Sequence, residues 1–129
     1  VEYFDNNNKP LDVSLLDQNT DFYVKFTVTL NNLIEYANNL TLTYLIPSGW
    51  EIINQNLFND QNNKDFNYVD YQDDRVSFYF DLMYNNKISF IVKLNATYKG
   101  DYIIPQVECN SMYNNNIYYT YPAQPVRVK

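Results

Sequence analysis

Residues 22–30 read FYVKFTVTL. Phe, Val or Leu stands at every second position of this segment, and Tyr, Lys or Thr stands between them. In an extended backbone successive side chains point to opposite sides, so this spacing places the apolar residues on one face. The segment therefore predicts a β-strand with one buried face.

Three more segments show the same alternation, at residues 40–46, 75–82 and 88–97. Weaker strand candidates are residues 2–4, 50–54, 67–71, 102–108, 117–121 and 126–128. Strands that arrive about every ten residues, with short turns between them, are typical of two packed antiparallel sheets. We expect an all-β fold, an antiparallel two-sheet β-sandwich of immunoglobulin-like architecture with about seven to ten strands.

Proline and turn-forming residues between the strands refine this expectation. Pro105 lies inside one of the weaker candidates, and proline has no N–H to donate to a neighbouring strand. That strand should therefore lie at a sheet edge, or be bulged or broken at Pro105. Turns are expected at residues 47–49, 84–87 and 99–101, and the polar, Asn-rich residues 55–66 predict a long surface loop. Residues 11–17 are ambiguous, and a single helical turn is one interpretation.

The bulk composition limits what the chain does. Its 129 residues fit one hydrophobic core, so we expect residues 1–129 to be a single domain, excised from a larger extracytoplasmic protein. The net charge of -6 and the absence of a basic stripe argue against nucleic-acid binding. No apolar run is long enough to cross a bilayer, so no membrane contact is expected from this domain.

Catalysis and metal binding have few candidate residues. The chain has no histidine and one cysteine, which excludes Ser-His and Cys-His catalysis, the commonest zinc sites and an internal disulfide. Asp70, Asp73 and Asp74 form the densest acidic cluster, which suggests either a calcium site or a carboxylate pair for glycoside hydrolysis. Because the spacing lacks the ligand ladder of an EF-hand loop, we favour a turn with Arg75 in a nearby salt bridge. No enzyme activity, cofactor or metal is expected.

Cys109 and Trp50 each allow a functional and a structural interpretation. A thioester needs Cys with Gln three positions on, and Cys109-Asn110-Ser111-Met112 supplies no Gln, so a buried or half-buried free thiol is favoured. Trp50 could belong to a sugar-binding platform, but its place at a strand start favours closing one end of the core.

Tyrosines gather near the C-terminus, at positions 113, 118, 119 and 121. Tyrosine offers a large amphipathic area for little entropy and is common at interfaces, so these side chains could form a contact surface. Alternatively, one face of the strand completes the core and the other faces water. The sequence leaves both interpretations open.

Several motifs have a recognisable order: residues 18–22, 47–52, 73–76, 80–82 and 100–102, then Pro105, Cys109 and Met112-Tyr113. Together they resemble the C-terminal macroglobulin-like domain, of the MG10 type, of bacterial α2-macroglobulins, across nearly the whole chain. The resemblance assigns structural motif positions to Pro47, Gly49, Trp50, Asp73, Asp74, Arg75, Gly100 and Pro105.

This chain departs from the family pattern at two places. Asn19 stands where many relatives have Gly, and Asn is compatible with a positive φ. Residues 110–114 read NSMYN where relatives often have acids at both ends. The change removes any salt bridge made by those acids and leaves Met112 and Tyr113 as candidate interdomain contacts, to which we add Tyr119 and Tyr121.

The resemblance implies a role in a protease trap. The family consists of periplasmic, membrane-anchored lipoproteins in which a protease cleaves a bait region and a thioester in a separate helical domain couples to it. The chain would be a non-catalytic interaction domain that packs against the thioester domain, with target proteases met only through the parent protein. The alternative is a carbohydrate- or surface-binding β-sandwich module that uses Trp50 and the C-terminal tyrosines.

Overall fold

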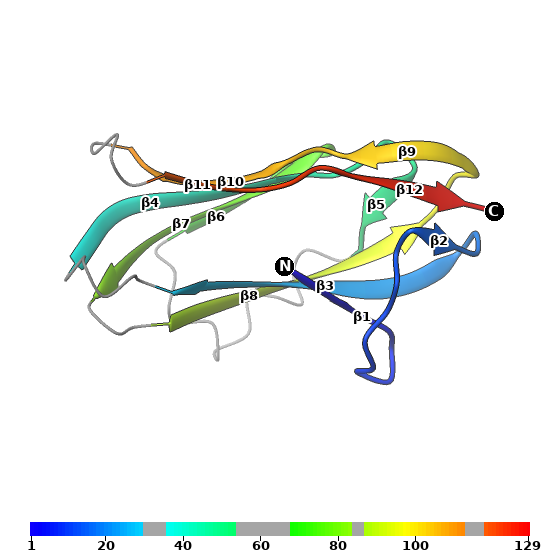
Figure 1. The fold of residues 1–129 in the computed structure, drawn as a ribbon, viewed down its shortest axis with the longest axis horizontal. Helices are drawn as coiled ribbons and strands as arrows, with labels where there is room; N and C mark the ends of the chain where they lie inside the picture. Colours follow the sequence, from blue (N-terminus) through cyan, green and yellow to red (C-terminus); the bar gives the residue numbers. More distant parts are fainter. Residues whose placement is uncertain (30–35, 54–67, 84–86, 113–117) are drawn as a thin grey trace.

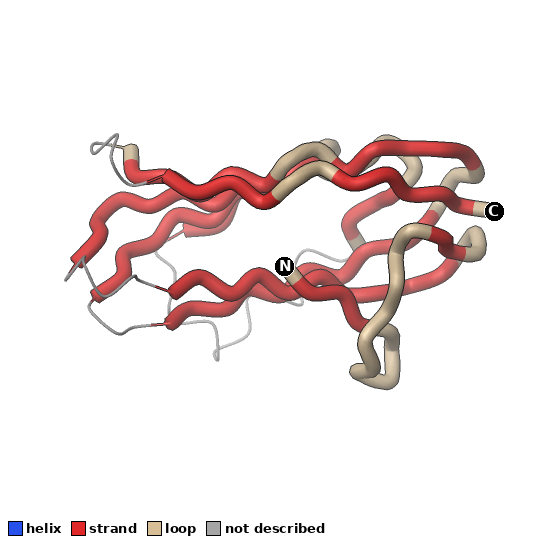
Figure 2. The backbone as a smooth tube through the Cα atoms, in the orientation of Figure 1, coloured by secondary structure: helices blue, strands red, loops and turns tan. Residues whose placement is uncertain are grey.

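The computed structural model describes residues 1–29, 36–53, 68–83, 87–112 and 118–129, and these residues form strands, turns and connecting segments but no helix (Figures 1 and 2). Accordingly, no described segment is a helix long and apolar enough to span a membrane. The strands are β1 (Glu2–Phe4), β2 (Leu15–Leu16), β3 (Thr20–Thr29), β4 (Tyr36–Leu45), β5 (Trp50–Ile52), β6 (Tyr68–Tyr71), β7 (Arg75–Met83), β8 (Lys87–Ala96), β9 (Gly100–Ile104), β10 (Val107–Ser111), β11 (Tyr118–Tyr121) and β12 (Gln124–Val128).

The strands form two layers, which Figure 1 shows one above the other. One layer is a four-stranded sheet in the order β1-β3-β8-β5, and the other is a five-stranded sheet in the order β11-β10-β4-β7-β6. A smaller sheet, β2-β12-β9, continues the second layer toward the C-terminus. The predicted all-β sandwich is therefore confirmed, with a third small sheet and more strands than expected.

The strand predicted at residues 22–30 is confirmed as far as Thr29, at the centre of the first layer, and Leu30 lies outside the described residues. β3 pairs with β8 in one unbroken antiparallel register from Thr20 opposite Ala96 to Thr29 opposite Lys87. Phe22, Val24 and Phe26 are buried, whereas the residues between them are partly exposed. A one-residue slip would turn this apolar set toward water, so the buried face fixes the register.

The core is closed by aromatic contacts between the layers. Phe78 of β7 stacks on Phe90 of β8 with ring centroids 4.2 Å apart, and Phe26 meets Tyr44 edge-on at 4.9 Å. The Tyr44 hydroxyl is buried and shares a hydrogen bond of 3.0 Å with the Tyr3 hydroxyl, so its polar tip has a partner inside the core.

The predicted weakness at Pro105 is confirmed as a break. β9 ends at Ile104 and β10 begins at Val107, while on the returning chain β11 ends at Tyr121 and β12 begins at Gln124. β10 pairs with β11 and β9 pairs with β12, both antiparallel. The four strands therefore form one long two-stranded ribbon, which is interrupted between β9 and β10 and again between β11 and β12. Pro105 and Pro122 lie in the two interruptions, where a missing N–H removes nothing from a ladder.

The interpretation of residues 11–17 as a helical turn is wrong. The Ser14 N–H donates to the Asp12 carboxylate at 2.9 Å, which makes a local turn, and Leu15–Leu16 then pair with β12 in a parallel arrangement. Leu16 is buried, and its anchoring explains why so short a strand persists. The predicted loop at residues 55–66 and most of the predicted hairpin turn at 84–87 lie outside the described residues.

Candidate interdomain surface

The motif residues around Gly49 form a turn that connects two strands. The Trp50 N–H donates to the Pro47 carbonyl at 3.0 Å, which closes the predicted turn. The Gly49 carbonyl in turn accepts from the N–H groups of both Thr97 and Tyr98, at 2.9 and 3.0 Å. This turn therefore ties the start of β5 to the end of β8.

One tyrosine ring lies over both glycines of the chain. A Cβ built on Gly49 would lie 2.1 Å from Cε2 of Tyr102, and one on Gly100 would lie 2.9 Å from the Tyr102 hydroxyl oxygen. The Tyr102 hydroxyl donates to the Lys99 carbonyl at 3.0 Å, which holds the ring in place. Gly100 also has a φ of 150°, whereas Gly49 has no such backbone requirement. Gly49 is thus needed for the close approach of Tyr102 alone, whereas Gly100 is needed both for this ring and for its backbone conformation.

Trp50 closes the end of the core, as the structural interpretation predicted. It is 3 % exposed and meets Phe22 edge-on at 4.8 Å. Its indole N–H is buried without a hydrogen-bond partner in the part of the chain that the structure describes. Trp50 therefore contributes nothing to a sugar-binding platform, and that part of the carbohydrate alternative is wrong.

The acidic cluster forms a turn rather than a catalytic pair. Asp73 and Asp74 lie between β6 and β7, and Asp74 pairs with Arg75 at 3.1 Å, as predicted. The hydrogen bond from Arg75 lowers the pKa of Asp74, whereas a general acid needs a raised pKa. Within the described residues no three acidic, Cys or His side chains gather closely enough to hold a metal ion.

Cys109 is the predicted half-buried free thiol. It lies on the inner face of β10, where it packs against the core. Burial raises the pKa of the Cys109 thiol to about 11, so the thiolate that a nucleophile requires is scarce at neutral pH.

The C-terminal tyrosines divide between two faces, so both interpretations of them hold in part. Directly opposed residues of an antiparallel pair share a face. Tyr121 and Tyr119 stand opposite Val107 and Cys109, on the inner face, and Tyr121 packs against the core. Tyr118 stands opposite Asn110 on the outer face and is 58 % exposed. Tyr119 is 67 % exposed although its face looks inward.

The outer face of the five-stranded sheet carries a row that crosses all five strands. Following the register from β11 to β6, the row consists of Tyr118, Asn110, Thr41, Tyr79 and Tyr68. We call these residues the outer tyrosine row. Tyr79 and Tyr68 have ring centroids 5.7 Å apart at one end, and exposed Tyr118 stands at the other. The next row holds the acids Glu108 and Asp70, so this face combines flat aromatic area with negative charge.

Met112 lies beside the outer tyrosine row, directly after β10. Its N–H donates to the Asn39 carbonyl at 3.0 Å, which fixes the backbone, while its side chain is 56 % exposed. Tyr113 lies outside the described residues. The sequence analysis named Met112 as a contact but did not name Tyr68 or Tyr79. The only sequence feature that could have indicated these two tyrosines is that they alternate with the apolar residues of their strands and so face outward.

Comparisons with known proteins agree on one family. Residues 1–116 match the model of the bacterial alpha-2-macroglobulin MG10 domain. Native Escherichia coli alpha-2-macroglobulin is similar with a TM-score of 0.88 at 20 % identity over 99 % of this chain, which spans 9 % of that molecule. A fragment of the same protein, from domain MG7 to the C-terminus, gives a TM-score of 0.88 at 20 % identity over 99 % of this chain and 22 % of its own length.

Salmonella alpha-2-macroglobulin reacted with methylamine gives a TM-score of 0.86 at 21 % identity, over 99 % of this chain and 9 % of that one. At this identity the likeness to solved structures concerns the fold alone. No protein with a curated description matches the sequence.

Proposed function

This chain belongs to the bacterial alpha-2-macroglobulin MG10 domain family, and from that membership we propose that it is a non-catalytic docking domain of a protease trap. In this proposal residues 1–129 are one domain of a longer extracytoplasmic, lipid-anchored protein. The domain packs against the thioester-containing helical domain of the same polypeptide and stabilises the resting arrangement until a protease cleaves elsewhere.

The observation that carries the proposal is apolar surface left exposed beside a complete core. Trp50 and the aromatic residues between the layers are buried, yet Met112 and Tyr118 project from neighbouring strands of one sheet edge. Methionine and tyrosine are enriched at protein interfaces, where they bury large areas. Of the other predicted contacts, Tyr119 is exposed on the edge strand β11, whereas Tyr121 packs against the core and is only partly accessible to a neighbour.

Two further features favour docking over chemistry. The pKa of Asp74 is lowered and that of Cys109 is raised, which is the wrong direction for a general acid and for a nucleophile respectively. The chain also spans only 9 % of full-length relatives, so a bait region and a thioester would have to come from the rest of the parent protein.

The test substitutes the exposed pair within the parent protein. Met112→Asp with Tyr118→Asp should leave the melting temperature of the 129-residue chain unchanged, because both side chains are exposed. In the parent, the same pair should lower the sedimentation coefficient of the resting form and reduce the fraction of trypsin captured. Tyr98→Asp, at another exposed tyrosine, is the matched control. Unaltered sedimentation and capture in the double variant would contradict the proposal.

A second function is favoured by the outer tyrosine row. A sheet face that carries aromatic side chains can bind sugar rings by stacking, and Asn110 and Thr41 lie between the tyrosines as hydrogen-bonding groups. If this function holds, soluble polysaccharides should retard the chain in affinity electrophoresis, and Tyr79→Ala should abolish the retardation. Equal mobility with and without polysaccharide would remove this candidate.

A further inference from the structure

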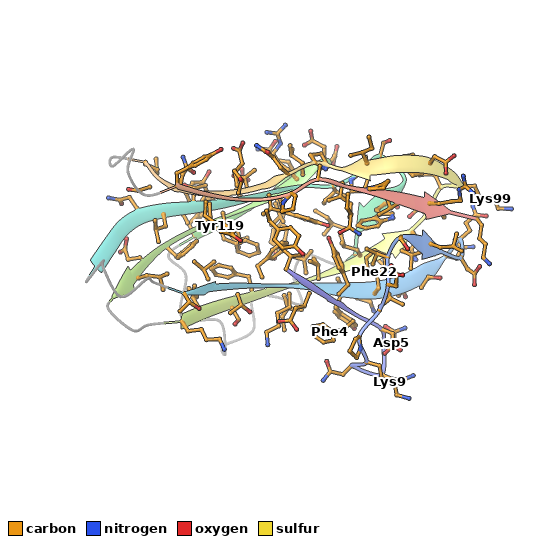
Figure 3. All side chains as sticks on the ribbon, viewed as in Figure 1. Phe4, Asp5, Lys9, Phe22, Lys99 and Tyr119 are labelled. Carbon is orange, nitrogen blue, oxygen red and sulfur yellow. The ribbon has the colours of Figure 1, made fainter. Side chains whose placement is uncertain are left out.

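The outer face of the five-stranded sheet combines aromatic rings with carboxylates. Figure 3 shows the side chains of the second layer projecting both into the space between the layers and away from it. Beside the outer tyrosine row, the registers place a second outward row that consists of Thr120, Glu108, Thr43, Ser77 and Asp70. In these two rows the charged side chains are Glu108 and Asp70, so this face is acidic.

Neither carboxylate is neutralised by a cation of the described chain. Asp70 accepts a hydrogen bond of 3.0 Å from the side-chain amide of Gln72, and Glu108 accepts one of 3.1 Å from that of Gln106. Both donors are neutral, and within the described residues neither acid takes part in an ion pair. The negative charge of this face is therefore left for a partner to match.

Two tyrosine rings stand next to one of these carboxylates. Tyr68 and Tyr79 have ring centroids 5.7 Å apart, and Tyr68 is 60 % exposed. Asp70 follows Tyr68 by two residues on β6, about 7 Å along the strand. A guanidinium group stacks on aromatic rings and also pairs with a carboxylate through two hydrogen bonds, so this corner fits arginine better than lysine. Arg75, on the same face of β7, is bound to Asp74 by two hydrogen bonds of 3.1 Å and is thus already paired.

The shape of the face restricts the backbone of the partner. β10, β4 and β7 each have a neighbouring strand on both sides, so their backbone groups are used within the sheet. A partner lying across this face must therefore satisfy its own backbone hydrogen bonds, as a helix does. The five strands span about 19 Å, which corresponds to about 13 helical residues. Asp70 and Glu108 are three strand spacings apart, about 14 Å, so cations on successive turns of one helix can reach both.

We propose that this face, defined by Tyr68, Asp70, Tyr79 and Glu108, docks a basic helix whose arginines stack on the tyrosines and pair with the carboxylates. The inference goes beyond the proposed function, because it adds a second contact surface and specifies the chemistry of its partner. Neutral sugars gain nothing from the two carboxylates, so the charges favour a basic polypeptide on this face.

The experiment titrates the 129-residue chain with three synthetic peptides and follows its backbone amides by NMR. Each peptide is alanine-based and about 18 residues long, because shorter helices are marginal in water. The three peptides carry Arg, Lys or Gln at the same positions, spaced so that these side chains share one helix face. The Arg peptide should shift the amides of Tyr68, Asp70 and Tyr79 and bind about two- to fivefold more tightly than the Lys peptide. The Gln peptide should not bind, and added salt should weaken the Arg peptide.

Matched variants separate this site from general attraction to an acidic chain. Asp70→Asn with Glu108→Gln should weaken the Arg peptide by about fivefold. Glu2→Gln with Glu51→Gln removes the same charge from exposed positions of the other layer and should leave the affinity unchanged.

A second pair of variants tests the rings. Tyr79→Leu should abolish the preference for Arg over Lys, because the stacking surface is lost. Tyr68→Leu should reduce that preference, and the exposure of Tyr68 makes a loss of folding unimportant there.

Equal affinities for the Arg and Lys peptides, or an equal loss in the two charge variants, would overturn the proposal. So would shifts at Tyr68 and Tyr79 with a soluble polysaccharide and none with the Arg peptide, because they would assign the face to sugars. The interdomain proposal stands or fails separately, since it is measured at Met112 and Tyr118 in the parent, and Tyr118 lies about 19 Å across the sheet from Tyr68.

Discussion

Replacement of Gly49 by alanine should destabilise the protein through a single contact. The added Cβ would lie 2.1 Å from Cε2 of Tyr102, far inside the contact distance of two carbon atoms. The atoms that this Cβ would meet, Cε2, Cζ and Cδ2, belong to the body of the Tyr102 ring rather than to a flexible tip, and the ring is held by the hydrogen bond to Lys99. Tyr102 must therefore move, because the turn backbone is fixed by the bonds from Thr97 and Tyr98.

The expected cost comes from two contributions. Overpacking of a well-packed site costs about 1–3 kcal/mol. Loss of the hydrogen bond from Tyr102 to Lys99 adds about 1 kcal/mol, so the total is about 3 kcal/mol. With an unfolding entropy of about 2.1 cal/mol/K per residue, this corresponds to a fall in Tm of about 11 °C for 129 residues.

A double-mutant cycle by urea denaturation tests this reasoning. Gly49→Ala is measured in the natural background and again in the presence of Tyr102→Ala, which removes the ring. Because Gly49 has no positive φ, alanine should cost nothing in the second background and should stabilise the fold by about 0.4–1 kcal/mol through the unfolded chain. An equal cost in both backgrounds would refute the explanation, since it would show that the turn itself rejects a Cβ.

Three further predictions concern burial, ionisation and the backbone. Trp50→Phe should lower the free energy of unfolding by less than about 1.5 kcal/mol, because it keeps a ring against Phe22 and removes the unpartnered N–H. Trp50→Ala should lower it by about 3–5 kcal/mol. Similar urea denaturation midpoints for the two variants would contradict this prediction. The contribution of Cys109 to stability should be constant between neutral pH and about pH 8.5 and should be lost as the pH rises toward 11, because the unfolded chain releases the Cys109 proton first. Cys109→Ala should reduce the slope of stability against pH in this range, and an unchanged slope would exclude the thiol as its cause. Asn19→Ala should cost about 1–2 kcal/mol by calorimetry because Asn19 has a φ of 69°, while Asn19→Gly should cost nothing, and equal costs would refute the backbone explanation.

The elements that could be predicted from the sequence are those set by local periodicity. β3 and β8 were correctly located because each has a buried face throughout its length, and the break at Pro105 followed from a missing donor. The positive φ of Asn19, expected from its place in the family motif, is confirmed.

The missed features depend on which strands become neighbours. β2 is two residues long and carries no periodic signal, and it forms because Leu16 is buried beside β12. The outer tyrosine row depends on the registers of four strand pairs, which no single segment encodes. For the same reason neither motif by itself predicts the contact of Tyr102 with Gly49.

The docking role is tested most directly by hydroxyl-radical footprinting of the isolated chain and of the resting parent protein, read out residue by residue by mass spectrometry. Met112 and Tyr118 are exposed in the chain, so both should oxidise readily there and be protected severalfold in the parent, while exposed Tyr98 should oxidise alike in both. Equal oxidation of Met112 and Tyr118 in the chain and in the parent would show that no neighbour covers this surface, and would contradict the account.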